Sequence, residues 1–277
     1  PDGLEEGPAV GTWRRERQAV RDKSRLFSAV LVAGRGVEDE LTMLEQAVRI
    51  AKQENGRLLG LHVLPKEADI NEEETAALAT FFEETLATNQ LKGAHSVVRG
   101  NPARHIAERA TFADLVVVSL RHPPGDTPLR RLNSGFHTLV QRISRPLLAV
   151  PVGSSSDLSR ILLAYDGSPK ADEALFVACY MALRWQSKLV VLTAVRGHTT
   201  NDAATKAKAY LDAHDTSATF VQTEDKITKA ILQTADEQHS NLLVMGGYGN
   251  RPVRQLIVGS TVDEMLRRFK RPILICR

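Results

Sequence analysis

Cysteine is scarce in this chain of 277 residues, which contains only Cys179 and Cys276. The two thiols are far apart in sequence and occupy a predicted helix and a predicted last strand, at positions typical of small apolar residues. We therefore expect reduced thiols in the core. The scarcity excludes a disulfide framework, and no metal-ligand spacing of cysteine and histidine is present.

Long apolar runs and a strong charge imbalance are also missing. No run approaches the 18 or more residues of a membrane helix, and the opening residues, PDGLEEGPAV, do not resemble a signal peptide. The net charge of +3 is too small to indicate a nucleic-acid partner, although basic clusters can still bind phosphate locally. We expect a cytoplasmic protein that does not bind nucleic acid.

The length suits two domains of about 130 residues better than one. Strand and helix patterns alternate throughout the first half. The expected strands there are 27–33, 58–64, 96–99, 114–119 and 146–150, and the expected helices are 37–53, 71–89, 101–111 and 134–143.

The second half repeats this order after a small polar linker. The expected strands are 161–165, 189–195, 218–222, 242–245 and 272–276, and the expected helices are 169–184, 202–212, 226–238 and 260–269. The halves are also similar in letters, since ADLVVVS matches SNLLVMG and SRPLLAVP matches KRPILICR at a spacing of roughly 130 residues. The fold class predicted is α/β, with two tandem, doubly wound, Rossmann-like domains, each a parallel sheet covered by helices on both faces.

The most informative stretch runs from Leu242 to Thr261, LLVMGGYGNRPVRQLIVGST. An apolar strand is followed by glycines at 246, 247 and 249. After nine more residues, Gly259, Ser260 and Thr261 begin a helix. Glycine-rich loops and helix N-termini expose N–H groups that bind anions, so phosphate is the expected ligand. The pattern is not a P-loop, because no Gly-Lys-Ser/Thr ends a short loop. It is not the dinucleotide fingerprint either, because it precedes the last helix and strand.

The spacing Gly-x2-Gly-x9-Gly-Ser resembles that of the nucleotide-binding members of the universal stress protein family. The resemblance implies an adenine nucleotide-binding fold related to the adenine-nucleotide alpha hydrolases, with ATP, ADP or AMP bound by the second half and Mg2+ accompanying a triphosphate. The site residues it implies are Ala164, Asp166, Val195, Met245, Gly246, Gly249, Arg251, Gly259, Ser260 and Thr261. No metal ligand and no catalytic residue is assigned.

Several of these residues have a second interpretation from local sequence alone. Asp166 begins a turn and can cap the helix at Pro169, Ser260 and Thr261 can be N-caps, and Arg251 can be a solvated loop charge. In the first half the counterparts differ: Gly34 is aligned with Asp166, the fourth strand ends in Ser119, and Asn133-Ser134 replaces Gly259-Ser260. We predict that the first half binds no ATP in this manner. A different anion site or a solvated basic loop remains open for Arg121, His122, Arg130 and Arg131.

These patterns divide the chain into a basic lead-in (1–24), a first domain with a degenerate site (25–152), a linker (153–158) and an ATP-binding domain (159–277). The lead-in is either a solvated helix or the soluble tail of a larger protein, since family domains occur fused behind membrane transporters. The expected function is that of an ATP-binding regulatory module and not of an enzyme. The two units are expected to pair with each other, much as single-domain relatives pair into dimers. Whether the whole chain also forms a homodimer stays open. The alternatives are an interaction module without ligand and a weak ATPase.

Overall fold

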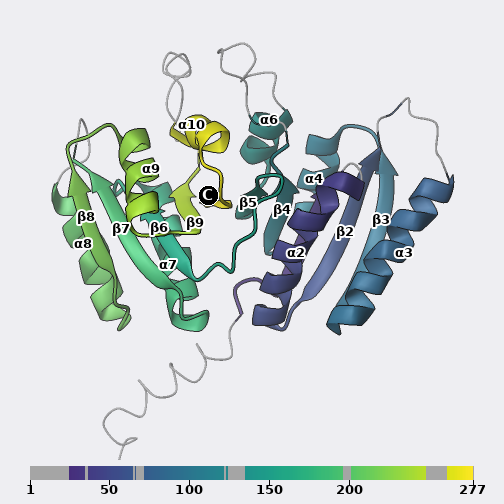
Figure 1. Ribbon diagram of the computed structural model, residues 1–277, viewed down its shortest axis with the longest axis horizontal. Helices are drawn as coiled ribbons and strands as arrows, with labels where there is room; N and C mark the ends of the chain where they lie inside the picture. The colour runs from purple at the N-terminus through teal and green to yellow at the C-terminus, as the bar shows by residue number, and fades with distance from the viewer. Residues whose placement is uncertain are drawn as a thin grey trace, which may run out of the picture.

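The computed structural model describes residues 25–34, 37–64, 66, 72–121, 123, 135–195, 201–247 and 261–276. The lead-in 1–24 and most of the glycine-spaced segment lie outside these ranges. Two units with the same order of elements follow one another (Figure 1). Unit 1 denotes the elements from β1 to β5, and unit 2 those from β6 to β10.

Unit 1 follows the predicted alternation of strands and helices. Its elements are β1 (Ala29–Gly34), α2 (Val37–Glu54), β2 (Arg57–Leu64), α3 (Glu72–Asn89), β3 (Lys92–Arg99), α4 (Pro102–Ala110), β4 (Leu115–Ser119), α6 (Gly135–Arg142) and β5 (Leu147–Val150). The cap expected before α4 is present, since Asn101 Oδ1 accepts from Arg104 N at 3.1 Å and proline follows. Strand β3 begins four residues before the prediction, because its polar residues pair through their backbones with β2 at the edge of the sheet.

Unit 2 repeats the pattern and matches the predicted ranges to within about one residue. Its elements are β6 (Arg160–Ala164), α7 (Pro169–Arg184), β7 (Lys188–Ala194), α8 (Asn201–Ala213), β8 (Thr219–Thr223), α9 (Ile227–Glu237), β9 (Leu242–Gly246), α10 (Thr261–Arg268) and β10 (Ile273–Cys276). Leu158, in the predicted polar linker, is only 1% exposed and packs into the core. Both cysteines are buried and neither forms a disulfide, as expected.

The strands form one continuous sheet of ten, in the order β3-β2-β1-β4-β5-β10-β9-β6-β7-β8. All pairs are parallel except β5 with β10, whose antiparallel register pairs Leu148 with Leu274. Two parallel sheets were predicted, and this antiparallel pair joins them. Every residue of β5 and β10 is buried, so each strand would otherwise be an exposed apolar edge.

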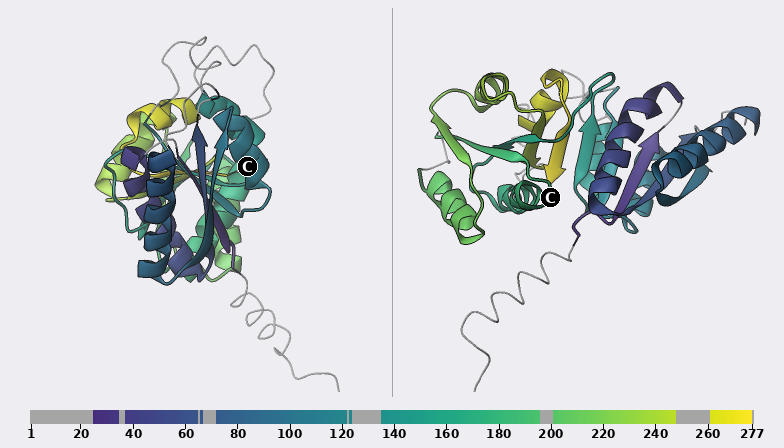
Figure 2. Two further views of the ribbon diagram at one scale, coloured as in Figure 1. Left: turned by 90° about the vertical axis from the view of Figure 1, so that its right-hand side faces the viewer. Right: turned by 60° about the horizontal axis from the view of Figure 1, so that its bottom comes forward.

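Helices cover both faces of the sheet (Figure 2). One apolar cluster packs α2, α3, α7 and α8 against one face, and a second packs α4, α6, α9 and α10 against the other. The doubly wound α/β fold predicted from the alternation is therefore confirmed. None of the helices that the structure describes combines the length and the apolar character needed to cross a membrane.

The two units are also joined by a buried carboxylate at the end of α2. Glu54 is 2% exposed, and its oxygens accept from Tyr180 Oη at 2.7 and 3.0 Å and from Trp185 Nε1 at 2.6 Å. Tyr180 Oη in turn accepts from Leu26 N at 3.0 Å. Burial, together with the bond to Glu54, raises the pKa of Tyr180 to about 12. This junction network connects α7 of unit 2 to α2 of unit 1.

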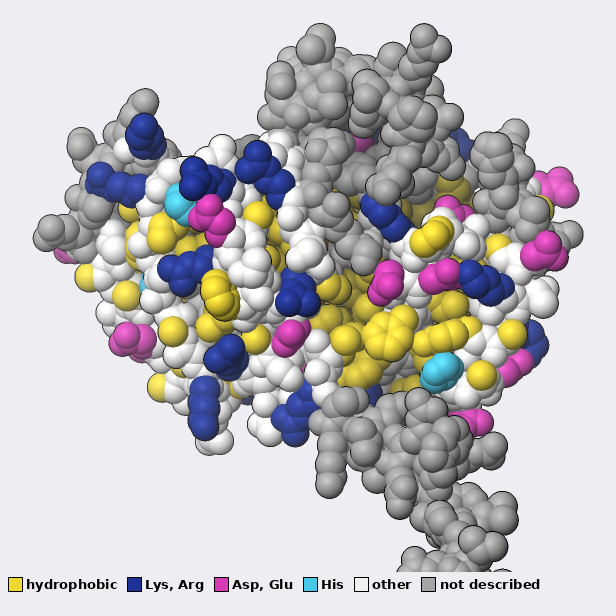
Figure 3. All heavy atoms as spheres, turned by 180° about the vertical axis from the view of Figure 1, so that it is seen from behind, with side chains coloured by type: hydrophobic (Ala, Val, Ile, Leu, Met, Phe, Trp, Pro, Cys, Tyr) yellow, Lys and Arg dark blue, Asp and Glu magenta, His cyan; other side chains and the backbone are white. Residues whose placement is uncertain are grey.

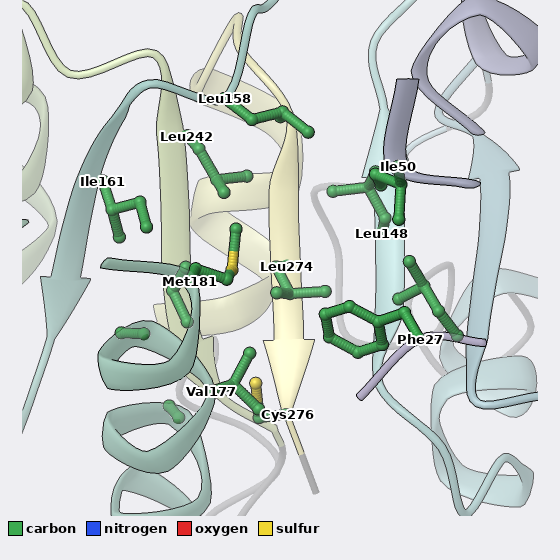
Figure 4. Packing of buried hydrophobic residues seen from close by; sticks show 14 of the residues in the cluster. Phe27, Ile50, Leu148, Leu158, Ile161, Val177, Met181, Leu242, Leu274 and Cys276 are labelled. Carbon is green, nitrogen blue, oxygen red and sulfur yellow. The ribbon is translucent and has the colours of Figure 1, made fainter. Parts of the chain in front are cut away.

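Side chains from both units fill the space next to this network. Figure 4 shows Phe27, Ile50 and Leu148 of unit 1 facing Leu274 of unit 2, with Met181 on α7 close by. The Phe27 ring centroid lies 6.3 Å from that of Tyr180 and 6.0 Å from that of Trp185. The core therefore continues from one unit into the other.

Candidate functional site

The predicted crevice lies where the carboxyl ends of β6, β7 and β9 meet. These strands are neighbours, in the order β9-β6-β7, and β6 and β9 flank the switch point of unit 2. Beyond their ends follow Asp166, Val195 and Gly247, three positions that the sequence places far apart. The fold thus brings these three positions to the same end of the sheet.

Asp166 forms a turn and is not the cap of α7. Its Oδ1 accepts from Ser168 N at 3.0 Å, while Ser168 Oγ accepts from Ala171 N at 3.3 Å as the N-cap. Gly167 between them has φ +76°, a conformation that favours glycine. Asp166 itself is exposed, so its carboxylate faces solvent at the crevice.

A network of side chains beneath this turn was not predicted from the sequence. Tyr165 Oη donates to Asp172 Oδ1 at 2.7 Å, and Lys206 Nζ on α8 donates to Asp172 Oδ2 at 2.6 Å. Tyr165 is 2% exposed, and burial, assisted by the bond to Asp172, raises its pKa. The network fixes the residue that precedes Asp166 against α7 and α8. Only the tertiary fold brings Lys206 to this position, so the sequence carried no signal for it.

The remaining described residues of the prediction differ in what they offer a ligand. Ala164 and Val195 are half-buried, and Val195 N donates to Thr223 O at 2.8 Å. Met245 is 5% exposed and its side chain belongs to the core, so only its backbone borders the crevice. Thr261 is the first residue of α10. Gly249, Arg251, Gly259 and Ser260 lie outside the described residues.

Gly246 has a packing role that was not predicted. A Cβ on this residue would meet the backbone of α7, at 2.8 Å from Lys170 C and 3.0 Å from Ala171 N. The first turn of α7 therefore rests directly on the end of β9. Space for this helix explains the glycine, independently of any phosphate.

Replacing Gly246 with alanine is expected to destabilise the protein by about 1–3 kcal/mol, because the clash is with backbone atoms that cannot rotate away. Urea unfolding monitored by circular dichroism measures this effect. Gly135→Ala is the matched control, since a Cβ there meets nothing within 4 Å. Equal stability of Gly246→Ala and the parent protein would show that α7 moves aside freely.

The helix that follows the glycine-spaced segment begins with acidic residues. Asp263 and Glu264 occupy the first turn of α10, where carboxylates interact favourably with the helix dipole. Glu264 is itself paired, with Lys226 at 3.1 Å and with Arg268 at 2.7 Å. These ion pairs neutralise part of the negative charge close to the expected phosphate position.

The register of the two units corrects the predicted alignment of Gly34 with Asp166. Asp114 N donates to Ala29 O and Asn241 N donates to Arg160 O, both at 2.8 Å, so Ala29 is equivalent to Arg160. Gly34 then corresponds to Tyr165, and by chain count Arg35 takes the position of Asp166. The prediction was wrong by one residue because it paired Ala29 with Ile161, whereas the hydrogen bonds pair Ala29 with Arg160.

The other predicted differences of unit 1 are only partly described. Ser119 ends β4 at the position of Gly246, and its buried Oγ has no hydrogen-bond partner among the described residues. Arg121 is exposed. His122, Arg130, Arg131, Asn133 and Ser134 lie outside the described residues, so the absence of ATP from unit 1 stays a prediction.

Comparison with protein families finds a match in unit 2. The model of the universal stress protein family matches residues 198–277, which include β8, β9, β10 and the glycine-spaced segment. Over these residues the chain is similar to the universal stress protein family. This match confirms the family that the glycine spacing indicated.

A curated relative and solved structures extend this similarity to the rest of the chain. A universal stress protein of Synechocystis sp. is 23% identical over 169 residues, which span 59% of this chain and 58% of the relative's length. The structure of a universal stress protein from Archaeoglobus fulgidus covers 91% of this chain and 97% of its own, with 19% identity and a TM-score of 0.76. A protein of unknown function from Pseudomonas aeruginosa covers 92% of this chain and 93% of its own, with 16% identity and a TM-score of 0.67. At these identities the structures establish the fold of both units.

Proposed function

We propose that unit 2 binds one adenine nucleotide, ATP or its di- or monophosphate, and that the chain is a nucleotide-responsive regulatory module. The observation that carries this proposal is the meeting of Asp166, Val195 and Gly247 at one end of the sheet, where the chain enters the glycine-spaced segment. In doubly wound folds, ligands bind in the crevice beyond the carboxyl ends of the strands. The family match of unit 2 includes this segment.

Each part of the nucleotide has a counterpart in the crevice. The exposed carboxylate of Asp166 would accept from the adenine amine or a ribose hydroxyl, and half-buried Ala164 and Val195 would border the base. Gly249, Gly259, Ser260 and Thr261 would supply N–H groups and hydroxyls to the phosphates, with charge from Arg251. Mg2+ would be carried chiefly by the phosphates of a triphosphate, as it is in other nucleotide sites.

Helix α7 provides the physical basis for regulation. It begins at Pro169, next to the Asp166 turn, and ends at Arg184, where Tyr180 and Trp185 contact Glu54 of unit 1. A nucleotide that favours one position of the turn over another would change the equilibrium between arrangements of the units. Such coupling requires that the nucleotide bind one arrangement of the units more tightly than the other, and it does not require ATP hydrolysis.

Calorimetric titration of ATP into nucleotide-free protein tests the binding proposal. We expect one site per chain, and we expect Gly259→Asp to weaken binding by at least about 100-fold, because it places a carboxylate where phosphate would lie. The matched control is Asn133→Asp at the counterpart position of unit 1, which should leave the affinity unchanged. Circular dichroism confirms that both variants remain folded.

Other outcomes separate the alternatives. Two sites per chain would show that unit 1 also binds nucleotide, and ADP formed during the titration would show ATPase activity. No binding at millimolar ATP would overturn the proposal and leave an interaction module without ligand.

A further inference from the structure

The opposite end of the unit 1 sheet carries a basic surface around an exposed aromatic ring. Arg57 begins β2, Lys92 begins β3, Phe112 lies in the turn before β4, and Arg145 lies just before β5. Since these strands are parallel, their amino ends meet, and all four residues line one hollow of about 570 Å3. This surface is called the amino edge of unit 1. It lies at the far end of the strands from the carboxyl side that holds the predicted crevices.

The charges of the amino edge are not neutralised within the described part of the chain. Arg57, Lys92 and Arg145 are exposed and make no ion pair there. The carboxylate that lines the hollow, Asp114, accepts from Ala29 N at 2.9 Å and so also stabilises the start of β1. Phe112 is 71% exposed, the largest exposed fraction among the large hydrophobic residues described. The exposed ring of Phe112 and the three unpaired cations therefore have no evident role in stabilising the fold.

Unit 2 shows that the fold does not need this charge. Phe112 N donates to Arg109 O as His239 N donates to Asp236 O, so Arg109 and Asp236 are equivalent positions. In unit 2, Asp236 accepts from Arg271, the counterpart of Arg145, at 2.5 Å. Unit 1 has arginine at both positions. Unit 2 thus has one arginine paired with one aspartate at these positions, whereas unit 1 has two positive charges.

The surroundings extend the positive charge. In Figure 3, Lys and Arg side chains are spread over the half of the face that belongs to unit 1, from the carboxyl to the amino ends of its strands. The described chain also begins here, since Ser28 lines the hollow and Arg25 Nη1 donates to Glu54 O and Asn55 O at 2.8 and 2.9 Å. The preceding segment contains Arg14, Arg15, Arg17, Arg21 and Lys23. The sequence therefore contains further cations shortly before Ser28.

We propose that the amino edge of unit 1 binds the surface of an anionic membrane. Cations close to a bilayer are attracted by acidic headgroups, and an exposed aromatic ring gains by entering the interface. Here the cations surround a single aromatic ring in an open hollow. Single-stranded nucleic acid, by contrast, is bound by several aromatic rings along a groove, and the hollow contributes only Phe112. The arrangement therefore favours a lipid surface.

Cosedimentation of the full chain with vesicles tests this proposal. We expect binding to vesicles of phosphatidylcholine with phosphatidylserine, little binding to pure phosphatidylcholine, and weaker binding as salt increases. The variant Arg57→Ala/Lys92→Ala/Arg145→Ala should lower the partition coefficient by about 100-fold, roughly fivefold per cation. Phe112→Ala should lower it several-fold with the charge unchanged.

A charge-matched variant of unit 2 provides the control. Lys188→Ala/Lys208→Ala/Lys229→Ala removes the same number of exposed cations and should bind vesicles as the parent does. Equal losses in both triple variants would overturn the proposal, because binding would then follow net charge alone. Failure to bind anionic vesicles, or tighter binding of a single-stranded oligonucleotide through Arg57, Lys92 and Arg145, would also overturn it. None of these results depends on nucleotide binding by unit 2.

Discussion

Replacing Phe27 with alanine should destabilise the protein by about 3–5 kcal/mol. The side chain is fully buried, and its ring lies between unit 1 and unit 2 beside Tyr180 and Trp185. Its loss would leave a cavity that both units border, and neither strand of the junction can move inward without breaking the β5–β10 pair. Urea unfolding, followed by circular dichroism and tryptophan fluorescence, measures the change.

The chain contains a matched control for this substitution. Phe112→Ala removes the same side chain from a position that is 71% exposed and should change the unfolding free energy by less than about 0.5 kcal/mol. If Phe27→Ala were as mild as Phe112→Ala, the junction would not be part of the cooperative core. Separate transitions of the two units in Phe27→Ala alone would instead locate the loss at the junction.

The second large effect is expected from Glu54→Ala, which removes the acceptor at the centre of the junction network. Trp185 Nε1, Tyr180 Oη and Phe27 N all donate to this carboxylate, and Trp185 Nε1 is buried with it. An unsatisfied buried donor costs about 1–3 kcal/mol, so the loss of this shared acceptor should destabilise by about 3–5 kcal/mol in total. Thermal and urea unfolding of the variant measure the cost.

Two further variants separate the hydrogen bonds from packing. Glu54→Gln keeps the shape but presents an N–H2 group toward donors, and we expect it to retain most of the destabilisation. Glu45→Gln changes an exposed carboxylate of the same helix and should be close to neutral. If Glu54→Gln were as stable as the parent protein, shape and not hydrogen bonding would account for the stability of the junction network.

Strand and helix order was predictable because buried parallel strands are short apolar runs and their helices have a clear period. The single continuous sheet was not predictable, because the sequences of β5 and β10 would be the same whether the two strands ended separate sheets or paired with each other. Glu54 illustrates the same limit: its acceptor role depends on Tyr180, which is 126 residues away. Polar residues at a helix end usually face solvent, so nothing local indicated burial.

The candidate site was predictable where spacing along the chain determines it. The glycine spacing and the strand ends led to Asp166 and Val195, which follow the carboxyl ends of the neighbouring strands β6 and β7. Asp172 and Lys206 were missed because their contact joins two helices. The packing role of Gly246 against Lys170 and Ala171 was missed for a similar reason, and its role toward a phosphate stays a prediction.

Joining both halves of the sheet within one polypeptide has a further consequence. Partners that associate as separate chains dissociate on dilution. Here a short segment, 151–159, connects β5 of unit 1 to β6 of unit 2, so that β5 and β10 belong to one chain and meet at an effective concentration that dilution does not change. The two halves also need not remain identical, as they would in a symmetric pair of equal chains. One half can therefore keep a crevice for a small ligand while the other acquires a different contact surface, always in a ratio of one to one.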